Sequence, residues 1–184
     1  MRSRWKNTAD GYSALSISLH WLMLLLLIAV YALMELKGNY PKGSAPREAM
    51  KDWHYMLGLS VFCLVWLRLG ARFSGTSPMV VPAMPAAQAL VAKAMHLALY
   101  ALMIALPLLG WLTLSASGTA VPFWGLELPA LIAKNKDTAK LLKEIHETLA
   151  NAGYFLIGLH AAAALFHHYV KRDNTLKLML PGRK

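Results

Sequence analysis

The sequence has 184 residues, of which 57% are apolar and only 15% are charged, and its mean hydropathy is +0.42. A soluble domain usually carries about a quarter charged residues, so this composition favours a membrane protein and excludes a disordered chain. The single cysteine, Cys63, excludes an intramolecular disulfide, a zinc site built on thiolates and an iron–sulfur cluster. The net charge of +10 would suggest nucleic-acid binding in a soluble protein. In a membrane protein the location of the charges matters more, and we expect no nucleic-acid partner.

Four long apolar stretches predict four transmembrane helices. They cover about residues 15–35, 53–71, 94–117 and 147–170. A helix of about 20 apolar residues crosses a hydrocarbon core of about 30 Å, and in lipid the backbone must satisfy its own hydrogen bonds. Residues 77–92 are apolar as well, but Pro78, Pro82 and Pro85 predict a surface loop there. The predicted fold is an all-α integral membrane four-helix bundle in a single domain over residues 1–184.

The segment between the third and fourth predicted helices, about residues 120–145, has features of a membrane interface. Val121-Pro-Phe-Trp-Gly predicts an interfacial turn with an aromatic anchor. Residues 137–145 alternate apolar and charged positions at helical spacing. We therefore predict an amphipathic lead-in to the fourth helix.

Lysine and arginine residues predict the orientation of the helices. One side of the membrane would hold 11 basic residues and two acids, and the other side eight basic residues and seven acids. Cytoplasmic loops carry an excess of Lys and Arg, so both termini are predicted to be cytoplasmic. The 11 basic residues of that side are Arg2, Arg4, Lys6, Arg68, Arg72, Lys93, Lys171, Arg172, Lys177, Arg183 and Lys184.

Several of the seven histidines lie within the predicted spans, where a polar side chain is costly and suggests function. His146 and His160 are 14 residues apart, which is nearly four helical turns, so their rings project from one face about 21 Å apart along the axis. His54 lies at the outer end of the second helix, at the depth of His146. His20 lies in the inner half of the first helix, close to the depth of His160. Two pairs of imidazoles are therefore predicted.

Two such pairs predict two haems of the b type. Two neutral imidazoles fill the axial positions of a six-coordinate haem iron, and the chain has no Cys-x-x-Cys-His motif for covalent attachment. Gly58 and Gly153 would leave room beside a flat porphyrin. His96, at inner depth on the third helix, could replace His20 opposite His160, and the residues alone leave this open. Packed, hydrogen-bonded histidines without a metal are the alternative interpretation.

Basic residues lie near both predicted haem sites. Arg68 and Arg72, one turn apart at the inner end of the second helix, are candidates for binding haem propionates, and they also fit positive-inside anchoring. On the outer side, Lys143 lies one turn before His146 and could attract a small anion. A solvated loop of mixed charge is the alternative for such lysines. The other lysines considered on that side are Lys37, Lys42 and Lys51.

The motifs on these helices resemble the bacterial cytochrome b561 family. The most specific one is the run from His146 to Tyr169, which is followed by Asp173-Asn-Thr-Leu. Ser18-Leu-His-Trp-Leu, Glu35-Leu-Lys-Gly, His96-Leu-Ala-Leu-Tyr and Ile104-Ala-Leu-Pro fit the family as well. The resemblance covers nearly the whole chain and implies a four-helix cytochrome of the bacterial inner membrane with two haems b. The family's ligand pattern falls on His20 with His160 and on His54 with His146.

The resemblance also implies an activity, that of a superoxide:ubiquinone oxidoreductase (a superoxide oxidase). Superoxide would be attracted near the catalytic Lys143, and its electron would pass through the two haems to membrane ubiquinone near His96, Arg68 and Arg72. One alternative is an electron-relay subunit that serves a dehydrogenase or a hydrogenase. A more remote alternative is a His-lined metal transporter. The sequence leaves open whether the chain forms a homo-oligomer.

Overall fold

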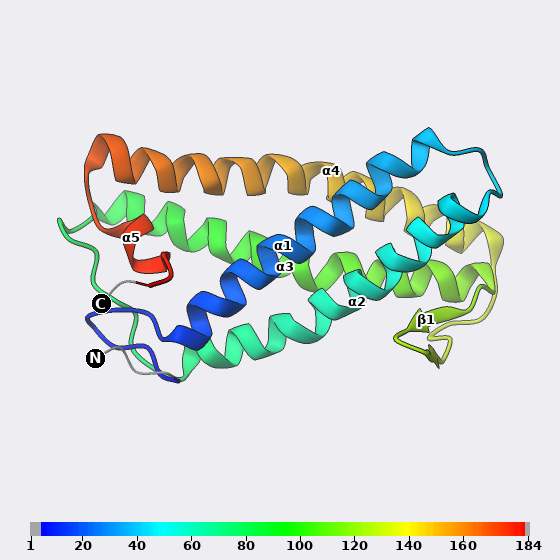
Figure 1. The fold of residues 1–184 in the computed structure, drawn as a ribbon, viewed down its shortest axis with the longest axis horizontal. Helices are drawn as coiled ribbons and strands as arrows, with labels where there is room; N and C mark the ends of the chain where they lie inside the picture. Colours follow the sequence, from blue (N-terminus) through cyan, green and yellow to red (C-terminus); the bar gives the residue numbers. More distant parts are fainter. Residues whose placement is uncertain (1–4, 183–184) are drawn as a thin grey trace. The chain divides into compact units, whose positions relative to one another are not determined.

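Four long helices account for most of the chain in the computed structural model, which describes residues 5–182 (Figure 1). Arg2, Arg4, Arg183 and Lys184, which contribute to the predicted orientation, lie outside the described residues. The long helices are α1 Ala14–Leu36, α2 Ala45–Phe73, α3 Ala86–Ser117 and α4 Lys136–Phe166. The short elements are η1 Lys37–Asn39, β1 Val121–Phe123, β2 Leu126–Leu128, η2 His167–Lys171 and α5 Thr175–Met179.

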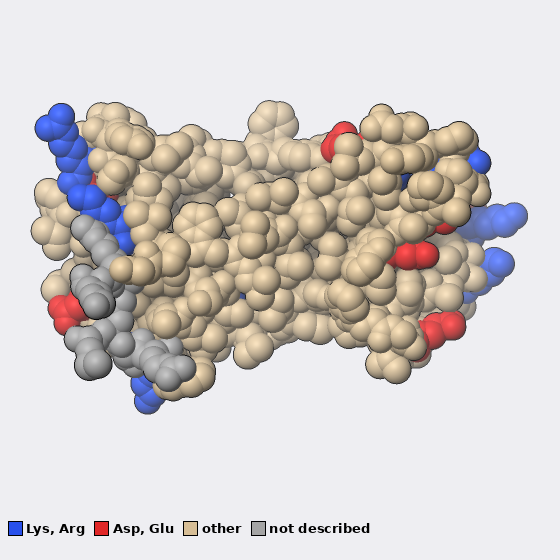
Figure 2. All heavy atoms as spheres, in the orientation of Figure 1, with Lys and Arg blue, Asp and Glu red and all other residues tan. Residues whose placement is uncertain are grey.

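The four long helices are each long and apolar enough to cross a membrane. Large apolar side chains remain on their surfaces, as shown by exposed fractions of 63% for Leu25 and 80% for Phe155. Figure 2 shows a wide area without atoms of Lys, Arg, Asp or Glu on the visible face. Such a surface is unfavourable in water and suited to lipid. The predicted all-α membrane fold with four spanning helices is therefore confirmed.

Two of the helices begin earlier than the sequence predicted. α2 begins at Ala45, and the amide of Glu48 donates to the carbonyl of Ser44, the residue just before the helix. α3 begins at Ala86, and the carbonyl of Pro85 accepts from the amide of Ala89. The predicted surface loop over residues 77–92 is thus wrong from residue 86 onward. Proline lacks an amide hydrogen but suits the start of a helix, and Pro85 initiates α3 instead of interrupting it.

The fourth helix is continuous with the predicted amphipathic lead-in. Residues 137–145 form the first turns of α4, and their amphipathic role at a membrane interface stays a prediction. At its other end, α4 passes into η2, a turn of π-helix, which ends at Arg172 in a left-handed conformation with φ of 56°. π-helical turns are uncommon and lower the regularity of the backbone hydrogen bonds. The chain then enters α5, whose first amide donates to Asp173.

The turn that the sequence predicted over residues 121–125 is part of a small β-hairpin. β1 and β2 are antiparallel, and Val121 is opposite Leu128. The turn residues Trp124 and Gly125 have φ of 49° and 85°, and tight two-residue hairpin turns require such positive angles. The indole nitrogen of Trp124 donates to Ser60 Oγ at 3.0 Å. Val121 also packs with Leu59 in a buried cluster, so the hairpin is fastened to α2 at two points.

The contacts of the chain group into two compact units. Unit 1 comprises Met1–Leu22, Leu64–Ala101 and Ala152–Lys184, and unit 2 comprises Met23–Cys63 and Leu102–Asn151. Each long helix contributes residues to both units. Unit 1 contains His20, His96 and His160, whereas unit 2 contains His54 and His146. The residues of each predicted histidine pair therefore belong to the same unit.

Candidate functional site

Unit 2 brings His54 of α2 and His146 of α4 together. Their ring centroids lie 6.2 Å apart, and the ring planes are inclined by 70°. When a metal ion is held between two imidazoles in a line, each metal–nitrogen bond is about 2 Å, and each ring centre lies ~1.1 Å beyond its nitrogen. The two centroids are then about 6 Å apart. The spacing of this pair would allow both rings to hold one iron.

The hydrogen bond of His54 also fits a ligand role. Its Nδ1 lies 3.0 Å from the carbonyl oxygen of Val30 on α1. A carbonyl only accepts, so Nδ1 carries the proton and donates, and Nε2 keeps its lone pair for a metal. Metal-bound histidines commonly donate their other ring nitrogen in this way, which fixes the orientation of the ring.

The ring of His146 is packed closely, with the backbone of Leu106 on α3 near it, but no hydrogen bond of full geometry reaches its Nδ1. That nitrogen is buried. Gly110 of α3 faces the ring, and a Cβ placed at this glycine would lie 3.5 Å from His146 Cε1. Gly110 therefore sets the space available to the imidazole.

Unit 1 places two histidines beside His160 of α4. The ring of His20 on α1 lies 6.3 Å from it, centroid to centroid, and the ring of His96 on α3 lies 5.5 Å from it. The first distance matches a pair that shares an iron, and the second is shorter than such a pair requires. Both His20, the predicted partner, and His96 lie beside the ring of His160, and which of them would bind the iron stays a prediction.

Arg68 of α2 occupies the site in unit 1. Its Nη2 lies 2.8 Å from His20 Nδ1, and its Nε donates to Tyr100 Oη at 3.2 Å. Arginine has no acceptor atom, so His20 Nδ1 accepts here, and the neutral ring carries its proton on Nε2. Ligation through Nε2 would require the proton to move to Nδ1 and Arg68 to release the ring.

A haem propionate would supply Arg68 with another partner. Its Nη1 is buried and has no hydrogen-bond partner, which is costly for a charged group. A carboxylate accepts from a guanidinium in a strong, charge-assisted hydrogen bond. The residues of unit 1 therefore fit a haem when Arg68 binds a propionate in place of His20.

The remaining residues proposed for cofactor binding occupy varied positions. Arg72 donates from Nη1 to Ser77 Oγ at 2.8 Å, at the end of α2. A Cβ at Gly58 would meet nothing within 4 Å, so space is open beside this residue. Gly153 is buried in α4. Open space at Gly58 is compatible with a flat ligand, and the roles of all three residues stay predictions.

Two imidazoles hold a metal ion well only when other ligands complete its coordination. Within residues 5–182, the structure has no group of three or more His, Cys, Asp or Glu side chains placed to hold a metal ion. A porphyrin supplies four nitrogens of its own, so a pair of histidines is enough. The donor set of both units suits haem iron.

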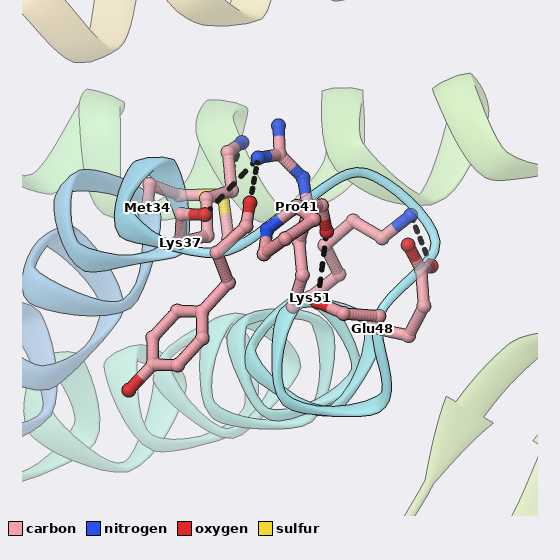
Figure 3. A network of polar contacts seen from close by, with 8 residues as sticks. Met34, Lys37, Pro41, Glu48 and Lys51 are labelled. Carbon is pink, nitrogen blue, oxygen red and sulfur yellow. Dashed lines mark hydrogen bonds and ion pairs between the residues drawn. The ribbon is translucent and has the colours of Figure 1, made fainter.

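Three lysines of unit 2, Lys51, Lys140 and Lys143, form ion pairs with carboxylates. Lys143 Nζ lies 3.0 Å from Glu147, and its side chain is 63% exposed. Lys51 forms an ion pair with Glu48, which is drawn in Figure 3. Glu147 offsets part of the charge of Lys143, and the catalytic role of this lysine stays a prediction.

Sequence analysis did not identify three of the contacts at these sites. Tyr100 lies one turn after His96, so its position beside the inner histidines was available from helical periodicity. The carbonyl of Val30 and the glycine at 110 carry no local signal, because their contacts depend on how the helices pack.

Comparison with known proteins agrees with this donor set. The chain matches the family described as prokaryotic cytochrome b561 over residues 11–182. It is 44% identical to "Cytochrome b561 homolog 1" of Escherichia coli (strain K12) over 175 residues, which cover 95% of this chain and 99% of the relative. It is 39% identical to "Probable superoxide oxidase CybB" of Yersinia pestis over 173 residues, 94% of this chain and 97% of the relative.

A more distant relative covers the chain to the same extent. "Cytochrome b562" of Cereibacter sphaeroides is 31% identical over 183 residues, which cover 94% of this chain and 97% of that protein. The match extends over all four helices and both histidine pairs. The chain therefore belongs to the prokaryotic cytochrome b561 family, whose members transfer electrons within membranes by means of haem b.

Proposed function

We propose that this protein is a superoxide:quinone oxidoreductase that carries electrons through two haems b. The observation that carries the proposal is the spacing of the two histidine pairs, 6.2 Å for His54 with His146 and 6.3 Å for His20 with His160. Each haem would supply an iron that accepts and releases one electron. The protein supplies the axial imidazoles, the position of each site and the charge around it. α4 carries one histidine of each pair.

Superoxide as the electron donor is supported by a relative and by the charge of unit 2. The relative from Yersinia pestis bears the name "Probable superoxide oxidase". Superoxide is an anion, and Lys37, Arg47, Lys51 and Lys143 belong to the unit that contains His54. We place this unit at the periplasmic side, because the other ends of the helices carry the larger excess of basic residues. Basic residues at the mouth of a site raise the local concentration of an anion.

Quinone reduction is proposed for unit 1. His96 lies 5.5 Å from His160, centroid to centroid, and Arg68 and Tyr100 lie at the same site. Imidazole, guanidinium and phenol groups donate hydrogen bonds to the carbonyl oxygens of a quinone. Arg72 adds positive charge near His96. A reduced quinone takes up protons, and the cytoplasmic side supplies them.

The decisive experiment has two stages. The purified protein is first assayed for haem by pyridine haemochrome, and about two haems b per chain are expected. A pulse of superoxide should then reduce the haems, and added quinone should reoxidise them. Haems that respond to a soluble dehydrogenase or hydrogenase but not to superoxide would identify a relay subunit. A colourless protein from haem-replete cells would contradict the cofactor itself.

A further inference from the structure

The cations near His54 and His146 differ in how far their charge is compensated. Lys143 pairs with Glu147, and Lys51 pairs with Glu48. Lys140 lies 4.0 Å from Glu144. Each of these lysines thus has a carboxylate one helical turn away. An ion pair presents little net charge to an approaching anion, so these residues attract it weakly.

Lys37 has a different environment. It is the first residue of η1, directly after α1, and its side chain is half-buried. Its ammonium donates to the thioether sulfur of Met34 at 3.1 Å (Figure 3). A thioether is a weak, uncharged acceptor. Within residues 5–182, no carboxylate lies within ion-pair distance of Lys37.

The position of Lys37 relative to the histidine pair distinguishes it from the other lysines without a carboxylate partner. Its charge contributes to the electrostatic environment of the His54 ring, although less than burial, Val30 and His146 do. Lys42, which also lacks an ion pair, is exposed on the loop between η1 and α2. Lys37 is therefore a half-buried cation without an ion pair, on which the carboxylate of Glu147 acts only from beyond ion-pair distance.

Arg47 fixes the turn that carries Lys37. Its Nη1 donates to the carbonyl oxygens of Lys37 and Tyr40, at 3.1 and 2.8 Å. These two hydrogen bonds tie α2 to the end of α1 and hold η1 in one conformation. A side chain that starts from a fixed backbone loses less conformational entropy when it binds an ion. The arrangement favours a preformed anion site at Lys37.

We propose that Lys37 is the residue that receives the anionic substrate at the site of His54 and His146, and that Arg47 positions it. The inference rests on the proposed function and assigns it a binding residue. Superoxide would give up one electron to the haem proposed at that site and leave as neutral dioxygen, with no bond formed to the protein. Because the product is uncharged, the same ammonium holds the substrate and releases the product.

A haem propionate is also an anion. It is therefore the other negatively charged group that Lys37 could bind. The two anions differ in their consequences. A cation that binds a propionate stabilises the cofactor, so its removal alters haem occupancy or reduction potential and slows every electron donor alike. A cation that receives substrate affects only donors that are negatively charged.

The test compares Lys37→Gln with Lys37→Arg, and Lys140→Gln serves as the matched control for an exposed, paired lysine. Haem reduction in the holoprotein is followed by stopped flow at low ionic strength with three donors: superoxide, the sulfur dioxide radical anion and the methyl viologen radical cation. Lys37→Gln should slow haem reduction by both anionic donors about three- to tenfold and leave the rate with the cationic donor unchanged. Lys37→Arg should restore the rate, and Lys140→Gln should match the wild type.

Salt provides an independent measurement. The difference between Lys37→Gln and the wild type should shrink as ionic strength rises from 10 mM to 0.5 M (roughly, from a Debye length of 30 Å to about 4 Å), because the attraction is screened. An equal decrease in the rate of haem reduction with all three donors, or a shifted haem reduction potential, would assign Lys37 to a propionate and overturn the proposal. A larger loss in Lys143→Gln than in Lys37→Gln would also overturn it.

The two proposals can fail separately. If superoxide does not reduce the wild-type haems, the proposed function is wrong. The comparison of the sulfur dioxide radical anion with the viologen radical cation then still determines whether Lys37 selects anionic donors.

Discussion

His54 Nδ1 lies 3.0 Å from the carbonyl oxygen of Val30, and this bond leaves Nε2 of the ring available to a metal. His20, its counterpart in unit 1, has Nδ1 next to Arg68 at 2.8 Å. One ring thus donates to a backbone carbonyl, whereas the other accepts from the side chain of Arg68. The two proposed haem sites consequently differ in how well their ligands are prepared for iron.

The first prediction concerns the haem count. His146→Ala should remove the haem of unit 2 and keep the haem of unit 1, because it deletes one axial ligand of a single pair. Pyridine haemochrome should fall from about two haems per chain to about one. His160→Ala should remove the other haem, which the reduced absorbance spectra of the two variants would distinguish. His168→Gln, which alters a histidine outside both pairs, should keep both haems, and full occupancy in His146→Ala would refute the pairing.

The second prediction separates His20 from His96 as the partner of His160. His20→Ala should lose the haem of unit 1, because the 6.3 Å spacing of the rings of His20 and His160 matches a shared iron. His96→Ala should keep that haem and instead slow its reoxidation by quinone. Haem content and quinone-dependent reoxidation, measured on the same preparations, would check both statements. The reverse pattern would assign the ligand role to His96.

A third prediction uses the close approach of α3 to His146. Gly110→Val adds a Cβ that would lie 3.5 Å from Cε1 of His146, together with two further methyl groups. The ring must therefore turn or shift. The haem of unit 2 should be lost or weakened, as seen by haemochrome and by a changed low-spin signal in electron paramagnetic resonance. Gly158→Val is the matched control, since a Cβ at this exposed glycine of α4 meets nothing within 4 Å. Equal occupancy in both variants would contradict the expected crowding.

The sequence was sufficient for the features that depend on local periodicity. Apolar windows predict the four helices because hydrocarbon allows few alternatives for the backbone. Helical rise and turn place His146 and His160 on one face of α4 and at different depths, and each has a partner histidine within its own unit. The first residues of the helices were harder to predict, because prolines such as Pro85 can either begin or interrupt a helix.

The features that the sequence did not reveal depend on contacts between helices. Arg68 could be assigned to a propionate, but its contact with His20 required the packing of α1 against α2 within unit 1. The spacing of Lys143 and Glu147 permitted an ion pair, yet many exposed pairs at this spacing are not formed. The hairpin turn uses Trp124 with positive φ, which is uncommon for a large side chain and hard to predict.

A fourth prediction concerns the N-terminal segment of unit 1. Asn7 is buried, and its side chain donates to the carbonyl of Ala71 and accepts from Ser13. A Cβ at Gly75 would overlap the backbone of Asn7, so Gly75→Ala must displace this segment. We expect a loss of about 1–3 kcal/mol in stability, measured as a lower unfolding temperature in detergent. Gly70→Ala, in α2 with nothing near its Cβ, should be neutral or slightly stabilising, and equal effects would refute the close contact.

The last prediction concerns the pH dependence of stability at the end of η2. Burial acts to raise the pKa of the Asp173 carboxyl, but hydrogen bonds from His167 at 2.5 Å and from Thr175 hold this pKa below its usual value of 3.8. A carboxyl with a lowered folded-state pKa favours folding above its unfolded-state pKa, and this contribution is lost as pH falls through the folded-state pKa. Asp173→Asn should therefore be less stable than the wild type at pH 7, by about 1–2 kcal/mol, and the difference should shrink below about pH 4.

Unfolding temperatures measured from pH 3 to pH 7 (roughly, across the titration range of a carboxyl) would show this convergence, whereas the exposed control Asp10→Asn should differ little from the wild type throughout. A constant difference between Asp173→Asn and the wild type at every pH would mean that the side chain stabilises η2 through its shape and not through its charge.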